Sequence, residues 1–155
     1  MNGIVKEILI AENAGDDLFP LKRAEFVSGK GIEGDRYFNS IGTFSEKLKE
    51  SGDFEVTLIE QEEIDAFNNI SGLNYSNSHF RRNIVTTGIR LNPLVGSKLS
   101  LGEVQLTVVR LCEPCAYLSD ILGEEIMQHM VHKAGIRAVI TKSGIAEAGN
   151  TVGQC

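Results

Sequence analysis

The segment 97–111, SKLSLGEVQLTVVRL, limits the possible folds more than any other part of the sequence. Two apolar runs flank Gly102. In the second run, Val104, Leu106 and Val108 occupy alternate positions. Alternate side chains of a strand point to one face of the sheet, and a glycine between two such runs favours a hairpin turn. The segment therefore predicts an antiparallel hairpin with one buried face, which makes a fold rich in β-sheet the first expectation.

Short apolar runs separated by glycine turns continue through much of the chain and predict further strands. Strands are expected at 3–11, 23–28, 53–59 and 82–88, and a second hairpin, around Ser143-Gly144, at 136–149. Helices are expected at 60–70, 116–122 and 124–134. In the first, Ile64, Phe67 and Ile70 lie on one face, and Gly72 is expected to end the helix. Gly135 is expected to end the third helix. Because strands do not alternate one-for-one with helices, the sequence predicts a mainly β, single domain over 1–155: a mostly antiparallel barrel with short peripheral helices.

The composition argues against several classes of protein. The 155 residues carry a net charge of -6, whereas proteins that bind duplex DNA or RNA usually have a basic surplus. The sequence contains no run of 18 apolar residues, which is the length expected of a membrane-spanning helix. Three cysteines, two of them close together, do not look like the disulfide framework of a small secreted protein. We therefore expect no nucleic acid and no membrane as partners, and a reducing cytoplasm as the compartment.

The glycine-rich stretch 29–34, GKGIEG, matches the G-x-G-x-x-G pattern of dinucleotide-binding loops. That function requires a helix directly after the loop, but the following residues lack helical periodicity. Glu33 and Asp35 would also repel phosphate. The stretch is better explained as a glycine turn that presents Asp35 and Arg36 together.

Arg81 and Arg82 form the one adjacent arginine pair in the sequence. Guanidinium groups bind carboxylates and phosphates in a fixed, forked geometry, so the pair is a candidate anion site in an acidic protein. A solvated strand end or a structural ion pair explains it equally well. If Arg36 and Arg82 line a pocket, we expect them at its rim, close to the cysteines described next.

Cys112-Glu113-Pro114-Cys115 is a C-x-x-C motif with three competing interpretations. A redox dithiol would need a βαβ setting, and Pro114 interrupts the helix that it requires. A zinc site would add His129 and His132, whose spacing after the cysteines approaches that of a zinc finger. Against this, a domain of this length needs no metal to fold.

The third interpretation is a single reactive or metal-binding thiolate at Cys115. The residue follows Pro114 and precedes an expected helix, whose N-terminus favours a thiolate, and Arg110 would add positive field. Two buried structural cysteines are the alternative. Spacing alone leaves the thiolate and the structural interpretation open.

Several motifs, taken in order, resemble the MOSC domain, which is named for the C-terminal part of molybdenum-cofactor sulfurases. They are GKGIEGDRY, RRNIVTTGIRLNPLVGSKLSLGEVQLTVVRLCEPCAYL, GIRAVI and GIAEAGNTV. The resemblance as a whole covers most of the chain, from about Gly3 to Val152. The resemblance implies a β-barrel with short peripheral helices that binds molybdenum cofactor (molybdopterin). It also implies a catalytic cysteine that handles the metal or sulfur of the cofactor, at Cys115, with Cys112 as a less constant companion.

The resemblance also implies cofactor-binding roles for other residues. Its Gly-Asp-Arg element corresponds to Asp35 and Arg36 after Gly34, and its Arg-Asn-Ile element corresponds to Arg82 and Asn83. Arg110 and Cys112 complete the candidate set. The sequence departs from the family pattern at two positions: Tyr37 stands where histidine is frequent, and Asn150 stands where aspartate is frequent. A tyrosine titrates far above neutral pH, which argues against acid-base chemistry at position 37.

These features together predict a stand-alone, bacterial-type MOSC protein. Cys115 would carry sulfur as a persulfide or ligate molybdenum, in cofactor sulfuration or in the reduction of N-hydroxylated compounds. As an enzyme it would be a sulfur transferase or a molybdenum-dependent reductase. A cysteine desulfurase that uses pyridoxal phosphate would then be a separate partner chain. The alternatives are a non-catalytic carrier of cofactor or sulfur, and a zinc-stabilised scaffold built on Cys112, Cys115, His129 and His132.

Overall fold

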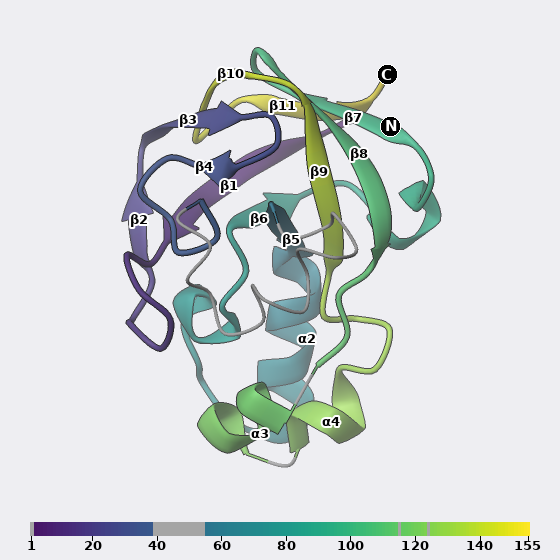
Figure 1. Cartoon of the computed structure of the whole chain (residues 1–155). Coiled ribbons are helices and arrows are strands. Elements are labelled where there is room, and N and C mark those ends of the chain that lie inside the picture. Colours follow the sequence, from purple (N-terminus) through teal and green to yellow (C-terminus); the bar gives the residue numbers. More distant parts are fainter. Residues whose placement is uncertain (1, 39–54, 115, 124) are drawn as a thin grey trace.

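Seven strands close into a barrel in the part of the chain that the structure describes (Figure 1). The structure is a computed structural model and describes residues 2–38, 55–114, 116–123 and 125–155. The barrel strands are β1 (Asn2–Ile10), β5 (Val56–Glu60), β6 (Ile84–Thr87), β7 (Lys98–Leu101), β8 (Val104–Leu111), β9 (Ile136–Lys142) and β11 (Thr151–Gln154). Their order is β1-β11-β7-β8-β9-β5-β6, and β6 pairs again with β1. Only β5 and β6 are parallel neighbours within this described barrel, so the predicted mostly antiparallel barrel is confirmed.

The hairpin predicted over 97–111 is present as β7 and β8. Gly102 makes the turn with φ of 55°, and the side chain of Asn150 occupies the space that a Cβ would need there. Val104, Leu106 and Val108 point into the barrel and are buried. The alternation of apolar residues in the sequence therefore correctly predicts which side chains of β8 face the interior of the barrel.

A second, three-stranded sheet lies beside the barrel and changes one prediction. It consists of β3 (Arg23–Val27), β4 (Gly31–Ile32) and β10 (Gly144–Glu147), while β2 (Phe19–Leu21) extends the barrel sheet at the end of β1. The hairpin predicted around Ser143-Gly144 is wrong, because β10 pairs with β3 and not with β9. The Ser28 N–H donates to the Ser143 hydroxyl at 2.8 Å, which holds the chain where it crosses to the second sheet.

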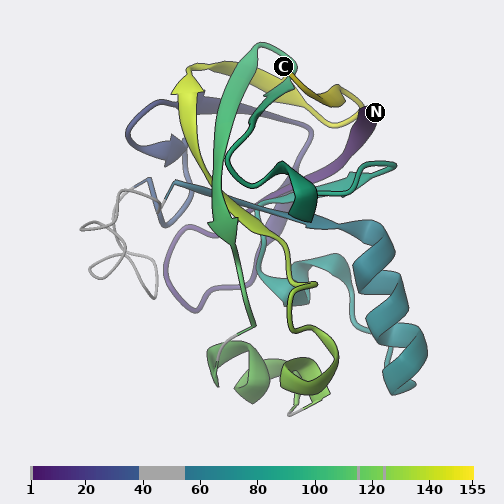
Figure 2. The ribbon, with the colours of Figure 1, turned by 90° about the vertical axis from the view of Figure 1, so that its right-hand side faces the viewer.

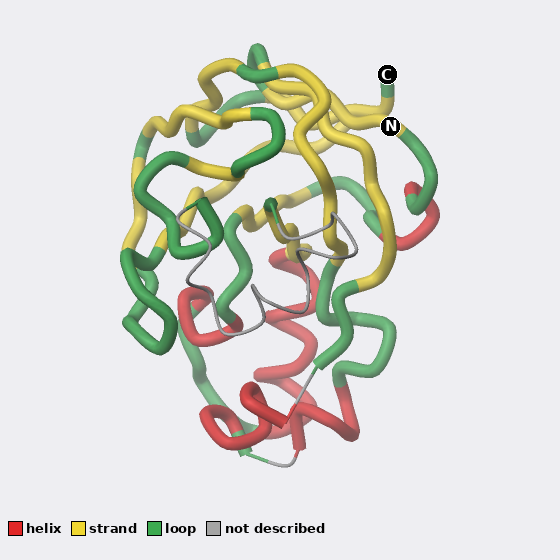
Figure 3. Tube along the Cα trace, viewed as in Figure 1, coloured by secondary structure: helices red, strands yellow, loops and turns green. Residues whose placement is uncertain are grey.

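Three α-helices lie below the barrel in the described part of the chain (Figures 1 and 3). They are α2 (Gln61–Ser71), α3 (Ala116–Leu122) and α4 (Glu125–His129). As predicted, α2 ends at Gly72, which has the left-handed φ of 72°. Ile64 and Phe67 are buried, but Ile70 is 67% exposed, because the last turns of α2 extend away from the barrel (Figure 2). None of the described helices has the length and apolar character needed to cross a membrane.

The helix predicted over 124–134 is shorter than expected. α4 ends at His129, and turns lead from there to Gly135. His132 has a φ of 61°, in the left-handed region that disfavours a continuing helix. The short 3₁₀ helices η1 (Asn77–Phe80) and η2 (Asn92–Leu94) complete the described elements.

Two apolar clusters stabilise this arrangement. One fills the barrel and includes Phe26 from the second sheet. The other lies between the outer face of the barrel and the helices; it consists of Leu9, Ala11, Leu18, Ile59, Ile64, Phe67, Phe80, Val85, Leu118, Leu122, Ile126, Met130 and Ala134. The second cluster fixes α3 and α4 at the lower end of the barrel, directly after the C-x-x-C motif.

Candidate functional site

Arg82 is buried between the C-x-x-C motif and the turn before β9. Its Nε donates to the Ala134 carbonyl at 2.8 Å, and its Nη2 donates to the carbonyls of Cys112 at 3.1 Å and Glu113 at 3.4 Å. A fourth bond reaches the Phe80 carbonyl. Arg82 is 6% exposed, so the expectation that it lies at a pocket rim is wrong. The charge is instead stabilised by oriented carbonyl dipoles, and it holds the backbone of the motif in place.

The motif begins in a well-packed position. Cys112 is buried, its thiol is free, and its N–H donates to the Gly135 carbonyl at 2.8 Å. Pro114 is also buried, and α3 begins at Ala116. Cys115, the predicted catalytic residue and metal ligand, lies outside the described residues. The described segments on either side belong to the Arg82-anchored end of the barrel.

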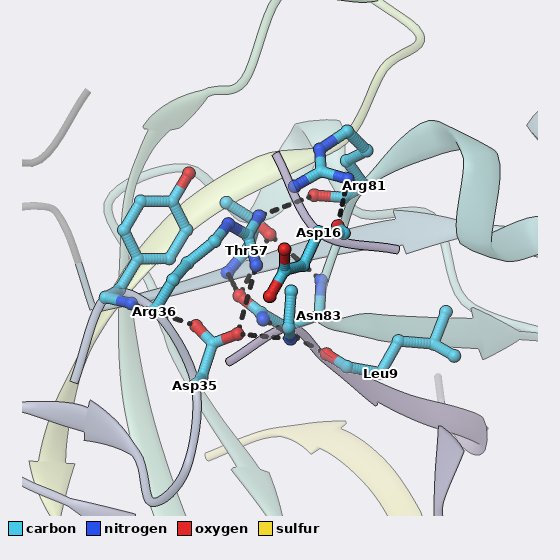
Figure 4. Close-up of polar contacts among 9 residues, drawn as sticks. Leu9, Asp16, Asp35, Arg36, Thr57, Arg81 and Asn83 are labelled. Atoms are coloured by element: carbon cyan, nitrogen blue, oxygen red, sulfur yellow. Dashed lines mark hydrogen bonds and ion pairs between the residues drawn. The ribbon is translucent and has the colours of Figure 1, made fainter. Parts of the chain in front are cut away.

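Asp35 and Arg36 occupy a turn that is bonded to the end of β1 (Figure 4). The Asp35 carboxylate accepts from the Ala11 N–H at 3.1 Å, the Arg36 Nη1 at 3.0 Å and the Tyr37 N–H at 3.3 Å. The Arg36 Nη2 donates to the Arg81 carbonyl at 3.3 Å. Both charged side chains are almost completely buried, so Arg36 is also not at a rim. Asp35 and Arg36 form a buried ion pair that links this turn to the arginine pair.

Asn83 connects three strands beside Arg82 (Figure 4). Its Oδ1 accepts from the N–H and the hydroxyl of Thr57, each at 3.1 Å, and its Nδ2 donates to the Leu9 carbonyl at 3.1 Å. The Leu9 N–H donates back to the Asn83 carbonyl at 2.6 Å. These bonds join Asn83 to β1 and β5 from within the protein, next to Arg82.

Buried arginines gather at this end of the barrel. The Arg36 guanidinium lies 4.5 Å from the centre of the Tyr37 ring, and that of Arg137 lies 5.9 Å from it. Arg81 and Arg82 are also buried, so the described residues include four such arginines here. Several guanidinium groups in a low-dielectric environment create a positive potential that attracts anions. The four buried arginines therefore give this end of the barrel a positive potential.

Arg110 and the two histidines lie outside the group of buried arginines. Arg110 is exposed on β8, opposite Arg137 in the strand register. The ring centre of His129 lies 6.4 Å from that of Phe67, and the Nδ1 of His132 lies 2.5 Å from a carboxylate oxygen of Glu113. Within the described residues, no three His, Cys, Asp or Glu side chains are grouped closely enough to hold a metal ion.

Two carboxyl groups near the barrel have raised pKa values. Burial raises the pKa of Glu55 above its ordinary value, although N–H groups of Ile140 and Gly29 donate to it and oppose the shift. Burial likewise raises the pKa of Glu60, against the N–H of Leu91 and the charge of Arg90. Both bonded carboxyls join separate segments, so their role is structural.

Sequence reasoning missed Arg137 as a member of the arginine group. The signal was present, because Arg137 is a single charge inside the apolar run of β9. Such a residue is expected to be exposed or to have a specific function. The role of Glu113 in holding His132 had no local signal, since the two residues are nineteen positions apart.

Comparisons with known proteins agree with this fold. The structure of the YuaD protein from Bacillus subtilis is similar, with a TM-score of 0.81 and 18% identity over 98% of this chain and 94% of that one. YiiM from Geobacillus stearothermophilus is similar with a TM-score of 0.71 and 14% identity over 100% and 75% of the two chains. YiiM from Escherichia coli also gives 0.71, with 17% identity over 100% and 70%. No curated protein matches the sequence closely enough to count as a relative.

The family itself is identified from the sequence. The family model of the MOSC domain matches residues 33–153, which include the Asp35-Arg36 turn, the arginine pair and the C-x-x-C motif. The match covers well over half of the chain and agrees with the barrel. The chain therefore belongs to the MOSC domain family, which is associated with the binding and sulfuration of molybdenum cofactor.

Proposed function

We propose that this protein binds molybdenum cofactor at the end of the barrel where the buried arginines meet the C-x-x-C motif. Membership of the MOSC family supports the cofactor class. The observation that carries the proposal is the convergence of Arg82 on the carbonyls of Cys112 and Glu113, because it joins a buried positive charge to the segment that precedes Cys115. Bound cofactor would supply an anionic pterin and a molybdenum atom held by its dithiolene.

In this proposal the buried arginines and Cys115 have different roles. The positive potential of Arg36, Arg82 and Arg137 favours the anionic part of the ligand. Those arginines act mainly through their field, since Arg36 and Arg82 already donate to protein acceptors. Cys115 provides the thiolate, a soft donor that suits molybdenum or sulfur chemistry.

Cys115 has two possible uses, and they differ in their chemistry. As a carrier, its thiolate attacks the outer sulfur of a persulfide on a separate cysteine desulfurase; the new S–S bond forms as the old one breaks, and the donor leaves as a thiolate. As a ligand, the thiolate binds the metal and no sulfur is transferred. Reduction of N-hydroxylated compounds remains a prediction, which a turnover assay with a supplied electron donor tests.

Titration of isolated molybdenum cofactor into the purified protein tests the proposal. The unmodified protein should bind saturably, and Cys115→Ser should weaken binding by about tenfold or more, a change of ~1.4 kcal/mol. Cys155→Ser is the matched control, because Cys155 is an exposed free thiol, and it should bind like the unmodified protein. Absence of saturable binding to the unmodified protein would refute the cofactor-binding proposal.

Cyanolysis distinguishes the two uses of Cys115. After incubation with a cysteine desulfurase and cysteine, cyanide should release thiocyanate from the unmodified protein and from Cys155→Ser if Cys115 is a carrier. Cys115→Ser should then release none. Saturable cofactor binding without released thiocyanate would favour the ligand role instead.

A further inference from the structure

Residues 12–17 form an exposed loop between two fixed points. The loop follows β1, and all six of its residues are exposed. At its start, the Ala11 N–H donates to the Asp35 carboxylate at 3.1 Å, and the Ala11 carbonyl accepts from the Arg36 N–H at 2.7 Å. At its end, Leu18 is buried in the apolar cluster beside the helices. Because both ends are anchored, a movement of the six residues between them would leave β1 and the cluster in place.

The middle of this loop is bonded to a buried arginine. The Arg81 Nη1 donates to the Asp16 carbonyl at 2.7 Å (Figure 4). The turn that presents this carbonyl is formed within the loop: the Asp16 N–H donates to the Asn13 carbonyl, and the Asn13 Nδ2 donates to the Asp16 Oδ2, both at 3.2 Å. Gly15 has a φ of 84°, which glycine adopts without strain. The conformation of the loop therefore brings its backbone to Arg81.

Arg81 connects the loop to the buried charges. Its φ of 60° is in the left-handed region, which costs free energy for a residue with a Cβ. Its N–H donates to the Ser78 carbonyl at 3.2 Å, and its own carbonyl accepts from the Arg36 Nη2 at 3.3 Å. Strained residues persist where their surroundings hold them on several sides, and they concentrate at functional sites. A change in the loop would thus be felt directly at the buried arginines.

The charge of the loop is opposite to that of the arginines. Glu12, Asp16 and Asp17 give it three negative charges. At physiological ionic strength charges interact over about 8 Å, and a loop that is bonded to Arg81 brings its carboxylates near the guanidinium group. These carboxylates lower the positive potential at this end of the barrel and repel an approaching anion. The Asp16 carbonyl is neutral, however, so an anionic oxygen is a stronger partner for Arg81 than this carbonyl is.

We propose that residues 12–17 are an acidic strap that closes over the buried arginines and opens when an anionic ligand binds. In the closed position the Asp16 carbonyl engages Arg81, and the strap carboxylates weaken the binding of every anion. A ligand that displaces this carbonyl releases the middle of the strap, while Ala11 and Leu18 keep its ends in place. This inference rests on the proposed function, because it adds control of access to the same positive end of the barrel.

Titration of isolated molybdenum cofactor into strap variants tests the inference. Asn13→Ala removes a bond that shapes the closed strap and leaves the net charge unchanged. Because the ligand binds to the open form, weakening the closed form should tighten binding by about two- to fivefold. Asp16→Asn keeps an acceptor for the Asn13 amide but removes one charge, and it should also tighten binding by about two- to fivefold. Glu147→Gln is the matched control, because it removes an exposed carboxylate on β10, and its affinity should be unchanged.

Hydrogen exchange measures the opening of the strap itself. The Asp16 amide is protected by its bond to the Asn13 carbonyl, so its exchange should become about threefold faster or more when the strap opens. The unmodified protein is measured with saturating cofactor and, separately, with inorganic phosphate against chloride at equal ionic strength. The Asn150 amide, which donates to the Glu147 carbonyl at 3.1 Å in a comparable turn, is the internal control and should not change.

The outcomes separate the strap from the proposed function. Saturable cofactor binding that is equally tight in the unmodified protein and in Asn13→Ala, with unchanged exchange at Asp16, overturns the strap and leaves the function standing. Equal gains in Asp16→Asn and Glu147→Gln also overturn it, because net charge alone would then explain them. Absence of cofactor binding refutes the function. In that case exchange in phosphate decides about the strap: faster exchange at Asp16 supports it, and unchanged exchange overturns it.

Discussion

Arg82 illustrates how single buried charges are stabilised in this protein. Its guanidinium group donates to four backbone carbonyls, and three of them belong to segments far away in the sequence. A buried charge without such partners would be strongly unfavourable. The residue therefore supports the fold and the site at the same time, and changing it should affect both.

The first prediction concerns the stability contributed by Arg82. Arg82→Met keeps a similar length but removes every donor, which leaves buried carbonyls without their partner. We expect the free energy of unfolding to fall by about 2–4 kcal/mol in urea titration. Arg110→Met, on the exposed part of β8, is the control and should change it by less than about 0.5 kcal/mol. Equal stability of the two variants would contradict a structural role for Arg82.

Glu55 carries the second prediction, which concerns pH. Burial raises its pKa above the ordinary value of 4.5, so the folded state holds this proton at pH values where the unfolded state has lost it. The contribution of Glu55 to the free energy of unfolding therefore decreases as the pH rises through the interval between 4.5 and the raised pKa. It is most favourable in acid.

Glu55→Gln should remove this part of the pH dependence. A glutamine oxygen still accepts from the Gly29 and Ile140 N–H groups but carries no charge to desolvate. We compare the free energy of unfolding of Glu55→Gln with that of the unmodified protein at each pH. The difference, variant minus unmodified protein, should be more positive at pH 7 than at pH 4. Denaturant titrations at pH 7 and pH 4 measure this difference. A difference that is more positive at pH 4 than at pH 7 would contradict a raised pKa of Glu55.

At the scale of elements, the entry into β9 positions the C-x-x-C motif. Gly135 has a φ of 100° and accepts from the Cys112 N–H. A Cβ at this position would overlap the Leu58 carbonyl on β5. Three strands therefore approach one another so closely at Gly135 that no other residue fits without movement.

A pair of glycine substitutions tests this close approach. Gly149 has a similar φ of 98°, but a Cβ there meets nothing within 4 Å. Gly149→Ala should cost only the conformational strain, about 1–2 kcal/mol of unfolding free energy. Gly135→Ala should lose about 1–3 kcal/mol more from overpacking, or fail to fold. Thermal or urea unfolding measures the stability of Gly135→Ala and Gly149→Ala. Equal losses of unfolding free energy would mean that β5 can move to make room for a Cβ at position 135.

Elements with a local signal could be predicted, and those set by distant contacts could not. The β7–β8 hairpin and the Gly72 stop of α2 follow from alternation and from a glycine at the right place. The pairing partner of β10 cannot be predicted from a local signal, because β3 lies more than a hundred residues earlier in the sequence. The connection between β9 and β10 also resembles an ordinary hairpin turn. α4 was predicted too long because the left-handed His132 depends on Glu113 and Asn92.

The candidate site shows the same limit. The resemblance to the MOSC motifs pointed to Asp35, Arg36, Arg82 and Asn83. The structure pairs Asp35 with Arg36 and bonds Arg36 to the carbonyl of Arg81, which directly precedes Arg82 and Asn83. Their burial was not predicted, because exposure depends on the packing of β1, β5 and β9 around them. The position of Cys115 lies outside the described residues, so its predicted role stays a prediction.

For the whole molecule, charge is distributed unevenly. The chain has a net charge of -6, yet four buried arginines gather at one end of the barrel. An acidic surface with a positive interior end suits a small anion and not a long polyanion. This distribution is consistent with the family's association with an anionic pterin cofactor.

The fold should not depend on a zinc ion. Two large apolar clusters support the barrel and helices, and His132 is engaged by Glu113. Excess chelator should therefore leave the thermal unfolding midpoint within about 1 °C of its original value. Added zinc should not raise it either. Cooperative unfolding on chelation would instead support the zinc-stabilised scaffold.

The content of molybdenum and pterin in the protein, purified from cells that make the cofactor, tests the central claim most directly. We predict that both copurify near one per chain with the unmodified protein and with Cys155→Ser, and that Cys115→Ser loses most of the molybdenum. Folding of each variant is checked by its thermal unfolding midpoint. A well-folded, unmodified protein that contains neither molybdenum nor pterin, and takes up neither from added cofactor, would contradict the account.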